Sequence, residues 1–175
     1  LSGGVATFTT SALPVGTHSM TAGYGGDANY NTSTSPALSQ VVNKAATSVS
    51  LVSGTNPSIA GGSVTFTATV TPSGATGTVS FLDGSTTIGT GTISGGVATF
   101  TTSALALGTH AITAVYGGDS SYNGSTSAVV NQVVNQGSTS VSLVSGTNPS
   151  TYDTSVTFTA TISASNATGT VTFKD

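Results

Sequence analysis

The stretch SVTFTATV at residues 63–70 alternates strictly between hydroxyl-bearing and apolar side chains. In an extended strand, successive side chains point to opposite faces, so the apolar set from Val64 to Val70 would share one face. The three threonines between them would share the other face. A period of two is typical of a strand with one buried and one exposed face. The alternation therefore predicts a half-buried β-strand.

Short runs of the same character continue on both sides of this strand, separated by Gly, Asn, Asp and Pro. Val79 and Phe81 repeat the alternation, and the Asp83-Gly84 that follows them predicts a tight hairpin turn. No stretch has the spacing of a helix. Further strands are expected at residues 47–53, 86–93, 96–103, 109–116 and 127–134.

The whole pattern returns along the chain at a constant offset of 92 residues. SGGVATFTTSAL begins at Ser2 and again at Ser94, and TSVSLVSGTNPS begins at Thr47 and again at Thr139. Of the 83 overlapping pairs 57 are identical, with no insertion or deletion, which is too regular for low complexity alone. A period of this length matches a whole small β domain rather than one solenoid coil or propeller blade.

The repeat predicts how the chain divides. Because both ends fall within a repeat, one module is complete and two are partial. The expected parts are the C-terminal part of a module at residues 1–43, a complete module at 44–135 and the N-terminal part of a further module at 136–175.

Seven short antiparallel strands without helices, in a unit of this length, predict an all-β fold. The expected architecture is a series of tandem immunoglobulin-like, seven-stranded antiparallel β-sandwiches with a 92-residue repeat. Each large apolar side chain that is fully buried would contribute roughly 1.5–3 kcal/mol to stability. The expected core residues are Phe66, Phe81, Phe100, Ile112, Ala114 and Tyr116.

The composition excludes several classes of function. The 175 residues include 28 Ser and 35 Thr but only five Asp, two Lys and no Glu or Arg, for a formal net charge of -3. Two cations cannot neutralise a phosphate backbone or form a basic patch for an anionic membrane, so no nucleic-acid partner is expected. The absence of Cys excludes disulfides and thiolate metal sites. The sequence contains no run of 18 apolar residues, so no membrane-inserted segment is predicted. Any secretion signal is expected outside this segment.

The order of these motifs resembles the bacterial immunoglobulin-like repeat domains found in tandem in secreted or cell-surface proteins. The elements that carry the resemblance are GTH at Gly108, AxYGGDxxY at Ala114 and QVV at Gln132, and it extends over the complete module and both partial ones. The resemblance implies a seven-stranded sandwich that acts as a spacer, stalk or adhesive module without catalytic activity. It also implies a bacterial protein with an extracellular or cell-surface location.

Recurring polar residues are the candidates for a site. His18 and His110 occupy equivalent positions, but each module has one histidine and no nearby thiolate, so a turn or strand-start role is expected rather than a metal or catalytic one. Neither a catalytic residue nor a cofactor is predicted. The weak calcium candidates are Asp27, Asp119, Asp83 and Asp175. Turn chemistry is the favoured explanation of these aspartates, because Asp accepts backbone N–H bonds in tight turns.

The sequence also contains candidate sites of covalent modification. Gln40 and Gln132 recur on the last strand and are expected to face solvent rather than to form a crosslink. Lys44 is replaced by Gln136 in the next repeat, which argues against a lysine crosslink. The N-x-Ser/Thr sequons, which are possible glycosylation sites, lie at Asn31, Asn123 and Asn166.

These observations favour a non-enzymatic structural repeat of an extracellular filament, stalk or surface fibre. Its expected partners are copies of itself or neighbouring modules, joined end to end. If the chain is a fragment of a longer protein, the position of its ends within a repeat has no structural meaning. If it is a subunit, residues 136–175 of one copy would complete residues 1–43 of the next and lack only residues 84–92. The alternative is an adhesin segment that binds a glycan or host protein through loops at one end of the sandwich.

Overall fold

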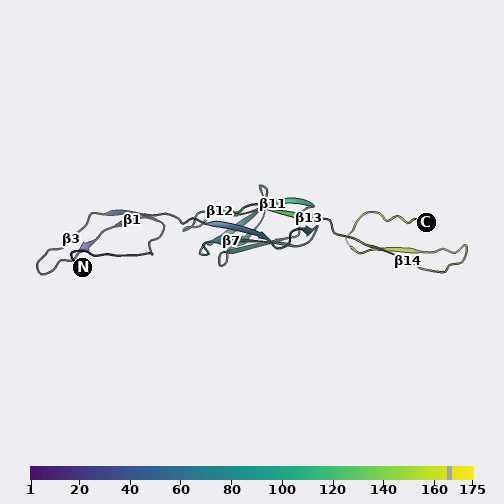
Figure 1. Ribbon diagram of the computed structural model, residues 1–175, viewed down its shortest axis with the longest axis horizontal. Helices are drawn as coiled ribbons and strands as arrows, with labels where there is room; N and C mark the ends of the chain where they lie inside the picture. Colours follow the sequence, from purple (N-terminus) through teal and green to yellow (C-terminus); the bar gives the residue numbers. More distant parts are fainter. Residues whose placement is uncertain (165–166) are drawn as a thin grey trace. The chain divides into compact units, whose positions relative to one another are not determined.

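A computed structural model describes residues 1–164 and 167–175, and this part of the chain forms strands and no helix (Figure 1). The chain divides into two compact units, Leu1–Val134 and Asn135–Asp175. We call residues 1–43 the N-terminal segment, 44–135 the complete module and 136–175 the C-terminal segment. The all-β fold predicted from the alternation of side chains is confirmed.

The complete module, all of which is described, contains two sheets. One sheet has the order β10 (Val97–Thr102), β7 (Val64–Thr71), β5 (Ser48–Ser53). The other has the order β6 (Ser58–Ile59), β13 (Val130–Asn135), β11 (Gly108–Tyr116), β8 (Thr78–Asp83), β9 (Thr86–Thr92), and β12 (Ser125–Thr126) also pairs with β11. The expected strands are present, and the two-residue strands β6 and β12 were not predicted.

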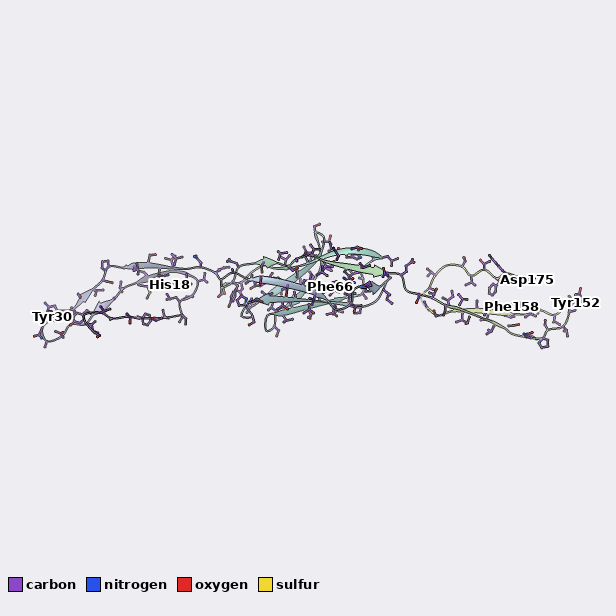
Figure 2. All side chains as sticks on the ribbon, viewed as in Figure 1. His18, Tyr30, Phe66, Tyr152, Phe158 and Asp175 are labelled. Carbon is purple, nitrogen blue, oxygen red and sulfur yellow. The ribbon has the colours of Figure 1, made fainter. Side chains whose placement is uncertain are left out.

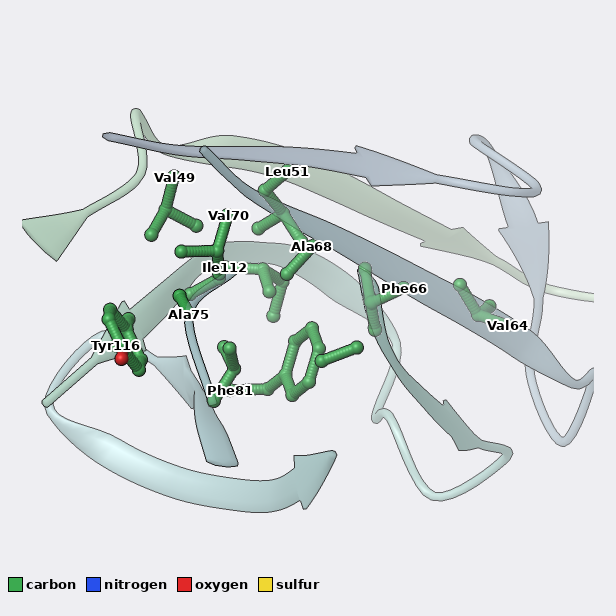
Figure 3. Packing of buried hydrophobic residues seen from close by; sticks show 13 residues of the cluster. Val49, Leu51, Val64, Phe66, Ala68, Val70, Ala75, Phe81, Ile112 and Tyr116 are labelled. Carbon is green, nitrogen blue, oxygen red and sulfur yellow. The ribbon is translucent and has the colours of Figure 1, made fainter. Parts of the chain in front are cut away.

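The predicted half-buried strand is β7, where burial alternates along its whole length. The apolar side chains of β5 and β7 face those of β8 and β11, and together they form one hydrophobic cluster (Figure 3). Phe66, Phe81 and Ile112 are fully buried there. Two sheets that enclose a common core make this module a sandwich of the immunoglobulin type, as predicted.

The expectation for Phe100 is only partly met, because this side chain packs against the core but remains partly exposed. Phe100 lies on β10, an edge strand, and its ring stacks on Phe81 with 5.6 Å between ring centroids. It also covers Gly89 on β9, the edge strand of the other sheet. A Cβ at Gly89 would lie 2.1 Å from Phe100 Cε2, so only glycine allows this approach. The ring therefore closes the open side of the sandwich.

The Asp83-Gly84 hairpin is confirmed. β8 and β9 pair antiparallel with Asp83 opposite Thr86, which leaves a two-residue loop. Gly84 has a φ of 57°, in the left-handed region that this kind of tight turn requires.

The two partial segments pair with the same registers as the complete module. In the N-terminal segment, β1 (Gly16–Met20) pairs with β4 (Leu38–Val42) and β2 (Gly23–Tyr24) pairs with β3 (Ser33–Thr34). In the C-terminal segment, β14 (Val141–Ser145) pairs with β15 (Phe158–Ile162). Each of these pairings matches one in the complete module at an offset of 92 residues.

Two stretches do not form the strands that their sequences form in the complete module. Residues 5–10 are identical to β10, and residues 170–175 correspond to β8, yet neither is a strand. In the complete module β10 pairs with β7, and β8 pairs with β9 and β11. The counterparts of these partners lie outside the segment in question, so the backbone has nothing to pair with.

Matched substitutions test where the core lies. Phe81→Ala removes a fully buried ring and should lower the free energy of unfolding by about 3–5 kcal/mol. Its counterpart Phe173 is 55% exposed, so Phe173→Ala should cost less than about 1 kcal/mol in dilute solution. Urea unfolding followed by tyrosine fluorescence measures both values. Equal losses for the two variants would contradict this placement of the core.

Candidate functional site

The most tightly held histidine of the chain lies near the start of β11. His110 Nδ1 is 2.6 Å from Asp83 Oδ2, and Nε2 is 2.9 Å from the carbonyl oxygen of Ala106. The side chains of His110 and Asp83 are 14% and 29% exposed. First the Ala106 carbonyl and then the Asp83 carboxylate raise the pKa of His110 above its ordinary value of 6.5. With acceptors at both ring nitrogens, the imidazole is held as a structural cation rather than as a free general base.

Asp119 organises the turn that follows β11. Its Oδ1 accepts hydrogen bonds from the backbone N–H groups of Ser121 and Tyr122, each at 2.8 Å. Its Oδ2 accepts from the backbone N–H and the hydroxyl of Thr76, each at 2.9 Å. These four donors hold the pKa of Asp119 far below its usual range, and the Thr76 N–H contributes most. The carboxylate therefore ties the turn after β11 to the segment that precedes β8.

The calcium candidates of the complete module lie at opposite ends of one strand pair. Asp83 is at the end of β8, opposite Ile112, whereas Asp119 follows the far end of β11. Asp27, in the N-terminal segment, accepts from the backbone of Asn29 and Tyr30 and from the Tyr24 hydroxyl. Asp175 is exposed. Among the described residues, no three His, Asp, Glu or Cys side chains gather in an arrangement able to hold a metal ion.

The expectation that Gln132 faces solvent is wrong, because this side chain is 0% exposed. Its Oε1 accepts from the Ser53 hydroxyl at 2.5 Å, and its Nε2 donates to the Thr55 carbonyl at 3.0 Å and to the Ser58 hydroxyl at 3.2 Å. The segment between β5 and β6 covers this position of β13, which the period of two along β13 alone does not reveal. Because every polar atom of the amide has a partner, its burial is tolerated.

Asn56 adds a second contact in the same region. Its Nδ2 donates to the Asn131 carbonyl at 2.8 Å, and its Oδ1 accepts from the Val133 N–H at 2.9 Å. The amide therefore pairs with β13 much as a neighbouring strand would.

The sequons are placed as follows. Asn31 is exposed in the N-terminal segment, and Asn123 is exposed in the turn that ends at β12. Asn123 Nδ2 donates to the carbonyl of Lys44 at 3.3 Å. Asn166 lies outside the described residues.

These polar contacts share one property. We call residues 44–83 the first half and residues 94–135 the second half of the complete module. Each contact joins the two halves: Asp83 to His110, Thr76 to Asp119, and Ser53 and Asn56 to β13. Sequence reasoning singled out Asp83, His110, Asp119 and Gln132 by their recurrence, but it did not predict which side chains contact one another. Recurrence of the partners at the same offset, as for Asp83 and Asp175, was the available signal.

Comparison with known proteins identifies a family and a similar solved structure. A family model described as "Bacterial Ig-like domain (group 3)" matches residues 1–43 and 51–135. A structure described as "Structures of Clostridium thermocellum CbhA fibronectin(III)-like modules" is 18% identical, with a TM-score of 0.41, over 70% of this chain and 64% of that chain. None of the curated proteins matches the chain. No helix in the described part of the chain has the length and hydropathy of a membrane span.

The raised pKa of His110 predicts how stability depends on pH. The folded module binds the second imidazole proton of His110 more tightly than the unfolded chain does. The contribution of protonated His110 to the free energy of unfolding is therefore complete below pH 6.5 and is lost as the pH rises through the folded pKa. The urea midpoint should therefore be higher at pH 6 than at pH 8.5. His110→Ala should cost about 1–3 kcal/mol at pH 6 and remove most of this pH dependence.

His18→Ala is the matched control, since this residue is the counterpart of His110 in the N-terminal segment. It should leave both the midpoint and its pH dependence unchanged. A wild-type midpoint that does not fall between pH 6 and pH 8.5 would contradict a structural imidazolium.

Proposed function

The chain belongs to the group 3 family of bacterial Ig-like domains, and on this premise we propose that it is a structural repeat of an extracellular stalk, surface fibre or filament. Domains of this kind are typically non-catalytic modules of structural or surface proteins. The proposed role of the complete module is to act as a spacer that transmits tension between its neighbours.

The observation that carries this proposal is the path of the chain through the complete module. On the N-terminal side, the Ala45 N–H donates to the Ser121 carbonyl and the Ala45 carbonyl accepts from the Asn123 N–H, both at 2.9 Å. These partners lie beyond the C-terminal end of β11. On the C-terminal side, Val134 pairs with Gly108, the first residue of β11. The chain therefore enters at one end of β11 and leaves at the other.

This path sets the length that a module contributes. β11 has nine residues. At about 3.4 Å per residue, such a strand spans roughly 30 Å. A module connected at opposite ends adds this distance to a tandem array, whereas a module with adjacent termini would add much less. Reach per residue is the property that a stalk or fibre requires.

The contacts at the two ends of the module suit a load-bearing role. Near the N-terminal connection, the Lys44 ammonium donates to the Asp119 carbonyl oxygen, and the Thr47 hydroxyl donates to the Asn123 carbonyl at 2.8 Å. At the other end, β13 is held by its ladder with β11 and by the amide of Asn56. Tension applied at the two connections would have to break these bonds together.

The outer surface of the module is polar because of threonine hydroxyls rather than charged groups, which is compatible with a spacer role. On the outer face of the β7–β10 pair, the hydroxyls of Thr65 and Thr101 lie 2.9 Å apart and are hydrogen-bonded. Threonine favours strands and supplies polarity without charge, so the module stays hydrated despite its few ionisable groups.

One observation favours the alternative, an adhesin that binds a glycan or host protein. Tyr152 replaces Ala60 of the preceding repeat and is fully exposed in the loop before β15 (Figure 2). An exposed aromatic ring on a loop is suited to stacking on a sugar. Binding on a glycan array that is lost in Tyr152→Ala would support this alternative over a passive spacer.

Single-molecule force spectroscopy tests the spacer proposal. The chain held between two marker domains should show one discrete unfolding step for the complete module. The step should release about 30 nm, because 92 residues extend to about 33 nm and the folded module already spans about 3 nm. Asp119→Ala should lower the unfolding force, since this carboxylate fixes the turn to which residues 44–47 are attached.

The matched control is Asp27→Ala, the counterpart of Asp119 in the N-terminal segment, which should leave that step unchanged. Smooth extension without a discrete step, at forces that stretch an unfolded chain, would rule out a load-bearing module.

A further inference from the structure

We propose that Asn123 is a site of spontaneous covalent modification, at which attack by the Gly124 backbone nitrogen releases the side-chain amide and weakens the attachment of residues 44–47. The inference goes beyond the spacer function and does not depend on it, because the chemistry requires only the folded chain and water. It rests on the residue that follows Asn123, on the free N–H of that residue and on the contacts that Asn123 makes.

The sequence at this position is unusual for the chain. Asn123 is the only asparagine that a glycine follows. A backbone nitrogen reaches the side-chain carbonyl carbon of the preceding asparagine most easily when its own residue is glycine, because a Cβ would obstruct the approach and restrict the backbone. The counterpart of Gly124 in the preceding repeat is Thr32, whose branched side chain hinders the same approach at Asn31. Of the two equivalent asparagines, Asn123 is therefore the reactive one.

The local structure leaves the reacting groups accessible. Asn123 and Gly124 are both exposed, in the stretch between Tyr122 and β12. Within the described part of the chain, no carbonyl oxygen accepts a hydrogen bond from the Gly124 N–H. A backbone N–H without an acceptor in the protein is open to water, which can remove its proton. The nitrogen that acts as the nucleophile is therefore not protected by secondary structure.

The reaction has two steps and uses no reagent except water. The Gly124 nitrogen loses its proton to hydroxide and attacks Asn123 Cγ, so that a C–N bond forms and the side-chain nitrogen leaves as ammonia. The product is a five-membered cyclic imide. Water then opens the ring at either carbonyl, which gives aspartate or isoaspartate at this position. No oxidation or reduction occurs, and the net change replaces the amide NH2 by a hydroxyl group.

Asn123 contacts residues 44–47 through three of its groups. Its backbone N–H donates to the Ala45 carbonyl at 2.9 Å, and its backbone carbonyl accepts from the Thr47 hydroxyl at 2.8 Å. Its Nδ2 donates to the Lys44 carbonyl at 3.3 Å, which is long for an N–H···O bond. The side-chain amide that reacts is therefore the least firmly held of the three groups.

Both products change these contacts. Aspartate has no amide N–H, so the bond to the Lys44 carbonyl is lost and a negative charge faces that oxygen. Isoaspartate adds a methylene group to the main chain before Gly124. A Cβ at Gly124 would lie 2.8 Å from the Tyr116 carbonyl oxygen, so the backbone is closely packed here and cannot lengthen in place. The turn must then move, and the bonds to Ala45 and Thr47 cannot both be kept.

The effect is confined to one connection of the module. Residues 44–47 are attached beyond the C-terminal end of β11, whereas Val134 pairs with Gly108 at the first residue of that strand. Neither Asn123 nor Gly124 belongs to the hydrophobic cluster. Modification should therefore loosen the N-terminal connection and leave the C-terminal connection and the core unchanged.

Mass spectrometry of the folded chain tests this proposal. The chain is purified from a host that adds no N-glycans and is incubated at pH 6 and at pH 8.5. The fragment that contains Asn123 should gain about 1 Da, the difference between an amide and a carboxylic acid. The rate should rise about tenfold for each unit of pH, because the nitrogen must first lose its proton to hydroxide. Asn31, which is also exposed, is the internal control and should stay unmodified.

Asn123→Gln is the matched variant. It keeps an amide but places the carbonyl carbon one methylene group further from the Gly124 nitrogen, so the ring that must close has six members. Modification at this position should fall at least about tenfold, because the reacting atoms are less well oriented.

Hydrogen exchange measures the effect on the connection. The isoaspartate form is separated from the fresh chain by ion exchange. Its Ala45 amide, which donates to the Ser121 carbonyl, should exchange at least about tenfold faster than in the fresh chain. The amides of β7 should exchange at the same rate in both forms.

An Asn123 that stays unmodified at pH 8.5 would overturn the proposal. So would equal modification of Asn31, or undiminished modification of Asn123→Gln. Equal exchange of the Ala45 amide in the two forms would overturn the weakening of the attachment. The unfolding step of the complete module under force is measured on the fresh chain, so failure here leaves the spacer function untouched.

Discussion

Each sheet of the complete module pairs a strand of the first half with a strand of the second: β7 with β10 in one sheet, and β8 with β11 in the other. Neither half can bury its apolar face alone, because the side chains that cover it come from the other half. The contacts of Asp83 with His110 and of Thr76 with Asp119 cross the same boundary. Folding of the module is therefore an association of two halves within one chain, and the hydrophobic core and the polar contacts form together.

Features that depend on neighbours in sequence were predictable. The burial of alternate residues from Val64 to Val70 follows from the pleat of a strand, and the Asp83-Gly84 turn follows from the backbone freedom of glycine. Features that depend on distant residues were not. SGGVATFTTSAL contains a strand at 97–102 but none at 5–10, although the two copies are identical. Local preference is the same in both, and only the presence of the pairing strand differs.

The same reasoning applies to the polar side chains. Recurrence at 92 residues marked His110, Asp119 and Gln132 as positions of interest, but their chemistry depends on partners 27 to 79 residues away. Gln132 has the sequence context of an exposed strand residue and is buried because the loop after β5 crosses it. A His–Asp pair can act in general-base catalysis, but the acceptors at both ring nitrogens of His110 indicate a structural role. A module built in this way suits the mechanical role proposed for it.

Amide hydrogen exchange at the two copies of SGGVATFTTSAL tests the central claim, that a strand forms only where its partner half is present. In dilute monomer, the amides that β10 bonds to β7 should exchange orders of magnitude more slowly than their counterparts in residues 5–10. Equal protection of the two copies in the monomer would show that the local sequence suffices, and would contradict the account.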